Sequence, residues 1–192
     1  MLDLTSARLC VVDVGCGIGQ LFVAKGHEIP PGVRRYAFDV DAAAIAYAKE
    51  RWPQQAEFAV APAERLPLKD DSVDFYVARV ALQVAHIPSV LQEAARVLIP
   101  GGRLWITPHP LSMTLDEIGT TVRKLKVKEL VMRSIVLVNG LVFQLTGRRS
   151  RILGVTSAWQ GERGMRRELA ADFRDVQVTS SRRHFLIEAI RR

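Results

Sequence analysis

Residues 12–19 read Val-Asp-Val-Gly-Cys-Gly-Ile-Gly, so a short apolar run leads directly into three alternating glycines. The run 9–14 is apolar enough for a strand that is buried on both faces. Closely spaced glycines let the backbone approach a ligand where a β-carbon would collide with it. The first turn of a following helix offers that ligand unpaired N–H groups and a positive dipole end. This stretch therefore predicts a strand, a ligand-binding turn and a helix.

The spacing of these glycines separates two classes of ligand. The dinucleotide fingerprint Gly-x-Gly-x-x-Gly fails in both registers, because its third glycine would fall on Gln20 or Phe22. Asp13 lies two residues before the first glycine, where it is unfavourable for a pyrophosphate but suits a ligand with an ammonium group and a cationic sulfur. Asp39 follows Gly19 by 20 residues and ends the next expected strand, where an acidic side chain can accept ribose hydroxyl hydrogens.

Strand and helix patterns alternate through the first 110 residues, which is typical of a parallel sheet covered by helices. We expect Asp41 to be the N-cap of the helix at 42–51 and Pro100-Gly101-Gly102 to form a turn after the helix at 89–98. The expected strands are 9–14, 35–40, 57–61, 73–78 and 103–107, and the expected helices are 42–51 and 89–98.

The pattern changes after Pro110. Thr114 and Glu117 have capping-box spacing, which predicts a helix with Thr114 as its N-cap. A second, more apolar segment runs to Leu145. Further on we expect a helix at 163–171 and a pair of strands at 176–179 and 185–190.

Charge is distributed unevenly along the 192 residues, whose formal net charge is +7. Residues 1–110 contain 11 basic and 12 acidic side chains, and residues 111–192 contain 16 and 8. The apolar fraction of 48% excludes a disordered chain. The N-terminus lacks the features of a secretory signal. The apolar stretch Leu130 to Leu145 is interrupted and shorter than the roughly 20 residues of a membrane span, which excludes a transmembrane protein but not a membrane-surface protein.

Four sequence blocks, in this order and spacing, resemble the class I S-adenosylmethionine-dependent methyltransferases, and in particular their small-molecule, type 11 branch, which includes quinone-biosynthesis enzymes. The blocks are VVDVGCGIG, FDVD, AERLPLKDDSVDFYVAR and RVLIPGGRLWIT. The resemblance covers roughly 9–107 and the terminal strand pair. It implies an α/β, Rossmann-like, seven-stranded, mostly parallel sheet in the order 3-2-1-4-5-7-6, with strand 7 antiparallel and helices on both faces. It also implies one domain over 1–192, with 111–154 inserted as a helical cap.

The resemblance further implies S-adenosylmethionine as the methyl donor. The glycine turn would wrap its methionine part, Asp39 would bind its ribose, and the chain at Ala63 and Glu64 would pass the adenine edge. The residues implied to contact the cofactor are Asp13, Gly15, Cys16, Gly17, Gly19, Asp39, Val40, Ala63, Glu64 and Arg79.

Two departures from the family pattern affect these expectations. The family commonly has Gly-Asp where this chain has Ala61-Pro62, and proline supplies neither a carboxylate nor an N–H. The loss of that contact to the adenine amine costs about 1 kcal/mol unless Glu64 replaces it. Only about eight residues precede the first strand, where family members carry helices that help to close the site. Either the cofactor site is therefore more open than in other family members, or it is closed by residues 111–154 or by another subunit.

His109 is the candidate general base, because it lies just beyond the fifth strand, at the end of the sheet where ligands bind. The competing interpretation is a loop histidine that shapes a turn between two prolines. His86 is the second choice, and a surface helix start is the simpler interpretation of it. No histidines pair at metal-ligand spacing and no Cys-x-x-Cys occurs, so no metal is expected. The histidines are His27, His86, His109 and His184.

The expected acceptor is a small, apolar or aromatic molecule, because an apolar cap suits such a ligand. The basic neighbours of the cap could instead contact an anionic acceptor or an anionic membrane. An RNA methyltransferase is the rival interpretation, supported by the basic C-terminal part but by no RNA-binding module. A non-catalytic cofactor-binding protein is the third. Cys10 and Cys16 are too few for a disulfide scaffold, so a cytoplasmic, possible membrane-peripheral location is expected. The sequence predicts no particular oligomer.

Overall fold

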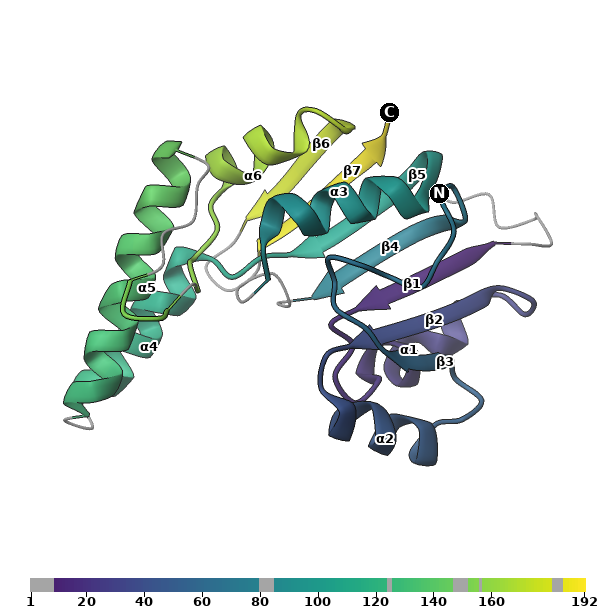
Figure 1. Ribbon diagram of the computed structural model, residues 1–192, viewed down its shortest axis with the longest axis horizontal. Coiled ribbons are helices and arrows are strands. Elements are labelled where there is room, and N and C mark those ends of the chain that lie inside the picture. The colour runs from purple at the N-terminus through teal and green to yellow at the C-terminus, as the bar shows by residue number, and fades with distance from the viewer. Residues whose placement is uncertain (1–8, 80–84, 124–125, 147–151, 156, 181–184) are drawn as a thin grey trace.

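A single seven-stranded sheet forms the centre of the computed structural model, which describes residues 9–79, 85–123, 126–146, 152–155, 157–180 and 185–192 (Figure 1). The strand order is β3-β2-β1-β4-β5-β7-β6. Strand β7 is antiparallel to both of its neighbours, and the other pairings are parallel. The predicted topology is therefore confirmed. The strands are β1 (Cys10–Val14), β2 (Arg34–Asp39), β3 (Glu57–Val60), β4 (Val73–Arg79), β5 (Leu98–Thr107), β6 (Phe173–Ser180) and β7 (Phe185–Arg191).

Helices cover both faces of the sheet. In Figure 1, α3 (Ile87–Val97) and α6 (Glu162–Leu169) lie in front of the strands. Their buried side chains form one core with β1, β4, β5 and β7. A second core, on the opposite face, joins α1 (Gln20–Lys25) and α2 (Ala42–Arg51) to β2 and β3, and the short 3-10 helix η1 (Gly26–Glu28) follows α1. These two cores explain why the central strands are apolar on both sides.

Helix α2 has the bounds that the sequence predicted, and its predicted N-cap is confirmed. Asp41 Oδ1 accepts hydrogen bonds from the N–H groups of Ala43 at 2.8 Å and Ala44 at 3.2 Å. An N-cap of this kind satisfies two donors that the first helical turn leaves unpaired.

The turn expected at 100–102 is instead a bulge inside β5. Strand β5 already begins at Leu98, which pairs with Val73, and the next paired residue, Arg103, lies opposite Phe75. The extra residues of β5 loop out of the ladder at Gly101, whose φ of 81° favours glycine. Helix α3 therefore runs into the strand without a separate turn.

Beyond β5 the chain forms two helices, α4 (Leu111–Arg123) and α5 (Val127–Thr146), which pack against each other and are called the α4–α5 hairpin below. Figure 1 places it beyond the ends of β4 and β5, beside α6. The predicted capping box is wrong, because α4 begins at Leu111 and Thr114 lies inside it. The carbonyl of Pro110 accepts the first hydrogen bond, from the Met113 N–H at 3.1 Å.

The expectation that no apolar segment is long enough to cross a membrane is wrong for helix α5. Its 20 residues, Val127–Thr146, extend beyond the stretch 130–145 and are long and apolar enough to cross a membrane. Its inner face nevertheless packs on the domain, where Asn139, Gly140 and Phe143 are buried. Length and composition alone therefore do not make it a span.

Candidate functional site

The glycine turn connects β1 to α1 at the carboxyl end of the sheet. Gly15, Gly17 and Gly19 all have positive φ, at 72°, 53° and 84°. A β-carbon at Gly19 would lie 2.7 Å from the ring of Phe58, whereas one at Gly17 would meet no atom within 4 Å. Gly19 is therefore required by packing as well as by conformation. Gly17 borders open space on the side where a ligand would approach.

Cys16 lies in this turn but points its side chain away from the open side. Its thiol is buried in the core that α1 and α2 form with β2 and β3. Burial raises the pKa of this thiol to about 12, so it is not a nucleophile at neutral pH. Its backbone N–H donates to the carbonyl of Phe38 at 3.0 Å, which holds the turn against β2. Cys16 could therefore contact a cofactor only through its backbone.

Asp13 is fully buried at the end of β1, and neither of its carboxylate oxygens has a hydrogen-bond partner among the described residues. Burial raises the pKa of this carboxyl to about 6, the nearby Arg79 opposes that rise, and Asp39 adds to it. An unpaired buried carboxylate is costly unless a cation or a hydrogen-bond donor neutralises it. Asp13 therefore fits a cationic group of a ligand at the glycine turn.

Asp39 lies beside the same turn, at the end of β2. Its Oδ2 accepts a hydrogen bond from the Gly17 N–H at 2.7 Å, and its Oδ1 accepts one from the Asp41 N–H at 2.9 Å. A carboxylate has about four acceptor positions, so Asp39 retains capacity for two ligand hydroxyls. Val40, the next residue, is 67% exposed and offers a bare apolar surface beside them.

The segment after β3 approaches the end of β2, because the Ala61 N–H donates to the Asp39 carbonyl at 3.0 Å. Ala63 follows as a half-buried residue, and Pro62 is exposed. Glu64 Oε1 accepts a hydrogen bond from the His86 N–H at 2.8 Å, at the start of α3. This carboxylate therefore ties the segment to α3, and that oxygen is not free to replace the aspartate that Pro62 lacks.

Arg79 lies at the carboxyl end of β4. Its Nε is buried without a hydrogen-bond partner in the described part of the chain, and its charge acts on Asp13. The structure therefore brings Asp13, Asp39 and Arg79 from three adjacent strands to one edge, as expected for parallel strands that meet at a ligand site.

A charge network centred on the buried Glu93, which sequence reasoning missed, holds the irregular segment 61–72. Glu93 Oε1 accepts a hydrogen bond from the Leu66 N–H at 2.6 Å and contacts Arg96 Nη2 at 2.6 Å. Arg96 also donates to Asp70 and to the carbonyl of Leu68. Burial would raise the pKa of Glu93, but hydrogen bonds from Arg96 and Leu66 lower it. Glu93, an acidic residue among the apolar positions of α3, was the sequence feature that could have predicted this network.

His109 follows the carboxyl end of β5, the strand next to β4, and packs between α4, α5 and residues 157–160. Its ring is buried, Nε2 lies 3.1 Å from Thr114 Oγ1, and Nδ1 has no partner within the described residues. Burial lowers its pKa, so the ring is neutral at pH 7. It lines a cavity of about 540 Å³ together with Arg133 and Val136 of α5. Thr114, expected as a helix cap, is thus the hydrogen-bond partner of this histidine.

The other histidines are less informative. His86 is the N-cap residue of α3, as the surface interpretation expected, with Nδ1 2.9 Å from Ser89 Oγ. His184 and the basic residues 148, 149 and 151 lie outside the described residues. In the part of the chain that the structure describes, no three His, Cys, Asp or Glu side chains are grouped to hold a metal ion.

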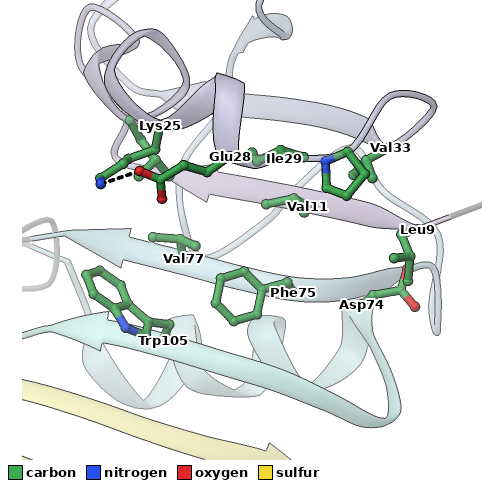
Figure 2. A pocket seen from close by; sticks show the side chains of 12 residues that line it. Leu9, Val11, Lys25, Glu28, Ile29, Val33, Asp74, Phe75, Val77 and Trp105 are labelled. Atoms are coloured by element: carbon green, nitrogen blue, oxygen red, sulfur yellow. Dashed lines mark hydrogen bonds and ion pairs between the residues drawn. The ribbon is translucent and has the colours of Figure 1, made fainter. Parts of the chain in front are cut away.

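A second cavity, of about 330 Å³, lies on the sheet face that α1 covers in part. Figure 2 shows Phe75 and Trp105 beside Val11 and Val77, opposite Ile29, with the Lys25–Glu28 ion pair at the rim. Its lining begins near Leu9 and Asp74, at the amino ends of β1 and β4. The lining extends along the strands to Val77 and Trp105 but does not include Gly15, Gly17 or Gly19, so this cavity is distinct from the glycine turn.

Residues 12–106 match the family model described as a methyltransferase domain. Malonyl-[acyl-carrier protein] O-methyltransferase of Hahella chejuensis is 38% identical over 110 residues, which are 56% of this chain and 39% of that protein. The ubiquinone/menaquinone biosynthesis C-methyltransferase of Bartonella quintana is 31% identical over 99 residues, or 48% of this chain and 38% of that protein. The chain covers between 22% and 45% of the length of such curated relatives.

Solved structures extend the likeness in fold to nearly the whole chain. A methyltransferase of Methanosarcina mazei has a TM-score of 0.60 at 21% identity, covering 98% of this chain and 93% of that one. Geranyl diphosphate C-methyltransferase of Streptomyces coelicolor, with bound S-adenosyl-L-homocysteine, has a TM-score of 0.65 at 14% identity, covering 97% and 75%. The match over residues 12–106, together with the strand order, shows that the chain contains a class I S-adenosylmethionine-dependent methyltransferase domain of the type 11 branch.

Proposed function

We propose that the protein transfers a methyl group from S-adenosylmethionine to a small, apolar or aromatic acceptor. The observation that carries the proposal is the buried, unpartnered Asp13 carboxylate beside the open glycine turn. A ligand that is cationic at its ammonium and sulfonium groups would neutralise it. The named functions of the relatives, which include O- and C-methyltransferases, support the same reaction.

The fit of this chain to the cofactor rests on its own residues. Asp13 would attract the cationic end, Gly17 leaves room for it, and Asp39 would accept the ribose hydroxyls. Val40, Ala63 and Glu64 would border the adenine. When bound, the cofactor supplies an electrophilic methyl group on sulfur, so the protein's main task is to align an acceptor with it.

The candidate general base, His109, is needed only for an acceptor that must lose a proton when it is methylated. His109 is neutral at pH 7, and in the tautomer whose Nε2–H donates to Thr114 Oγ1 the Nδ1 atom would be able to accept a proton. The adjoining cavity combines three apolar side chains with five polar or charged ones, which suits a molecule with both an apolar part and polar groups. Its lining residues are Met132, Val136, Val155, His109, Lys128, Glu129, Arg133 and Ser157.

The RNA interpretation loses support because several basic side chains of the C-terminal part make internal contacts. Arg167 Nη2 donates to the Phe143 carbonyl at the end of α5 at 2.7 Å, and Arg192 Nε donates to the Phe173 carbonyl at 3.1 Å. Arg166 is paired with Glu162. A phosphate backbone would need such charges to be available at the surface.

Calorimetry tests the cofactor assignment. Asp39→Ala should weaken S-adenosylmethionine binding by about tenfold or more, because it removes two hydrogen bonds to the ribose. Asp41→Ala is the matched control, since it removes the neighbouring helix cap without a cofactor contact. Equal affinity of the Asp39 variant and wild type would refute the ribose assignment.

Transfer of a labelled methyl group into fractionated cell extract tests the acceptor class. We expect label in the small organic or lipid fraction, and none in the RNA fraction. Label confined to RNA would overturn the small-molecule proposal. Cofactor binding without transfer to any fraction would support a non-catalytic binding protein.

A further inference from the structure

The outward face of α5 is apolar along its whole length. Its most exposed apolar side chains recur at intervals of four, seven, three and four residues. Half-buried Leu130, Leu137 and Val142 widen this face. At about 100° per residue the apolar positions cover an arc of about 140°. The exposed members are Val127 (72%), Val131 (48%), Val138 (49%), Leu141 (55%) and Leu145 (62%).

The opposite face of α5 is fixed to the domain. Asn139 Nδ2 donates to the carbonyls of Val155 at 3.0 Å and Ser157 at 3.1 Å, and Phe143 is fully buried. A helix held in this way lies along the surface and does not leave the domain to cross a bilayer. Within the exposed face, Ser134 donates its hydroxyl to the Leu130 carbonyl, so burying this face leaves that donor satisfied.

Basic side chains border the apolar face at its amino-terminal end. Arg123, Lys126 and Lys128 are exposed where α4 leads into α5. Lys128, which also lines the cavity beside His109, lies three residues before Val131, close enough for its aliphatic stem to lie on apolar surface while its ammonium group stays in water. The one acidic residue in the sequence of α5, Glu129, is paired with Lys126 at 2.6 Å. The charge on this border therefore complements an anionic surface.

A helix that binds another helix as a coiled coil has a different distribution of apolar and charged residues from that of α5. A coiled-coil seam is narrower than the arc of α5 and is flanked by alternating acidic and basic positions that select the partner. Beside the apolar face of α5, the described residues provide basic charge and one already paired acid. A broad apolar arc, interrupted by the hydrogen-bonded Ser134, with a cationic border instead matches helices that lie in the plane of a membrane interface.

We propose that the outward face of α5 binds to the surface of an anionic lipid bilayer. The apolar side chains enter the boundary between headgroups and acyl chains, and the basic side chains contact the headgroups. This surface is separate from the glycine turn, so the proposal does not depend on methyl transfer.

Flotation with lipid vesicles tests the proposal with the full chain. Wild type should float with vesicles of equal phosphatidylcholine and phosphatidylglycerol, and should bind pure phosphatidylcholine at least fivefold more weakly. Leu141→Gln/Leu145→Gln should lower binding to the anionic vesicles at least tenfold. Arg123→Glu/Lys128→Glu should lower it by a similar factor and remove the preference for phosphatidylglycerol.

The matched control is Tyr47→Gln/Val60→Gln, which alters exposed apolar side chains on α2 and β3 and should leave vesicle binding unchanged. Circular dichroism checks that each variant is folded, as expected for substitutions at exposed positions. Absence of wild-type binding, or equal binding by the α5 variant, would overturn the proposal. So would a wild-type dimer that the α5 substitutions dissociate, with no vesicle binding by either form, because a second copy would then cover this face.

Discussion

At the residue scale, the burial of the Asp13 carboxyl makes both the stability of the fold and its affinity for a cationic ligand depend on pH. Its pKa of about 6 lies above the ordinary 3.8, so the folded protein binds a proton more readily than the unfolded chain. The free energy of unfolding should therefore fall as pH rises from about 4 to about 6, by a total on the order of 3 kcal/mol. A cationic ligand binds the deprotonated Asp13 carboxylate more tightly than the protonated carboxyl. Cofactor affinity should therefore rise across the same pH range.

Asp13→Asn should remove both effects. We expect a gain of about 1–3 kcal/mol in the free energy of unfolding at pH 7.5, and a loss of the slope between pH 4 and 6 that urea denaturation measures. Calorimetry should show at least a tenfold loss of S-adenosylmethionine affinity. A variant that is less stable yet binds normally would contradict the role of Asp13.

His109 gives a second prediction at this scale. If its Nδ1 accepts the acceptor's proton, His109→Gln should lower kcat about 100-fold while leaving cofactor affinity unchanged. Thr114→Val is the control, because it removes only the hydrogen bond to Nε2 and should reduce kcat far less. An unchanged kcat in the glutamine variant would leave His109 with a structural role, holding α4 against residues 157–160.

At the scale of elements, the docking of α5 depends on one glycine. A β-carbon at Gly140 would lie 2.0 Å from Trp159 Cδ1, whereas one at Gly119 in α4 meets nothing within 4 Å. Gly140→Ala should therefore lower the free energy of unfolding by about 1–3 kcal/mol through overpacking. Gly119→Ala should raise it by up to about 1 kcal/mol, because alanine favours helix. Thermal and urea denaturation of both variants measure the contrast, and equal effects would contradict the packing.

At the scale of the whole molecule, cofactor binding should stabilise the fold, because the site joins β1, β2 and β4. S-adenosylmethionine at 100 times its Kd adds about 2.7 kcal/mol, which should raise Tm by about 5–10 °C in a chain of this size. Differential scanning fluorimetry measures this shift. A tenfold loss of affinity in Asp13→Asn or Asp39→Ala should reduce the shift to about half or less at the same concentration, and a full shift in both variants would place the ligand elsewhere.

The sequence by itself determined the alternation of strands and helices, the glycine turn and Asp41 as a helix cap, whereas the strand order followed from the resemblance to the methyltransferase family. These depend on local rules: strand periodicity, positive φ at glycine and a side chain that reaches two residues along the chain. It did not reveal that Glu64 would bind the His86 N–H, or that Thr114 would pair with His109 instead of capping α4. Such contacts follow from the packing of distant segments. Only the tertiary structure decided which face of α5 is buried, because both faces of that helix are apolar and periodicity could not separate them.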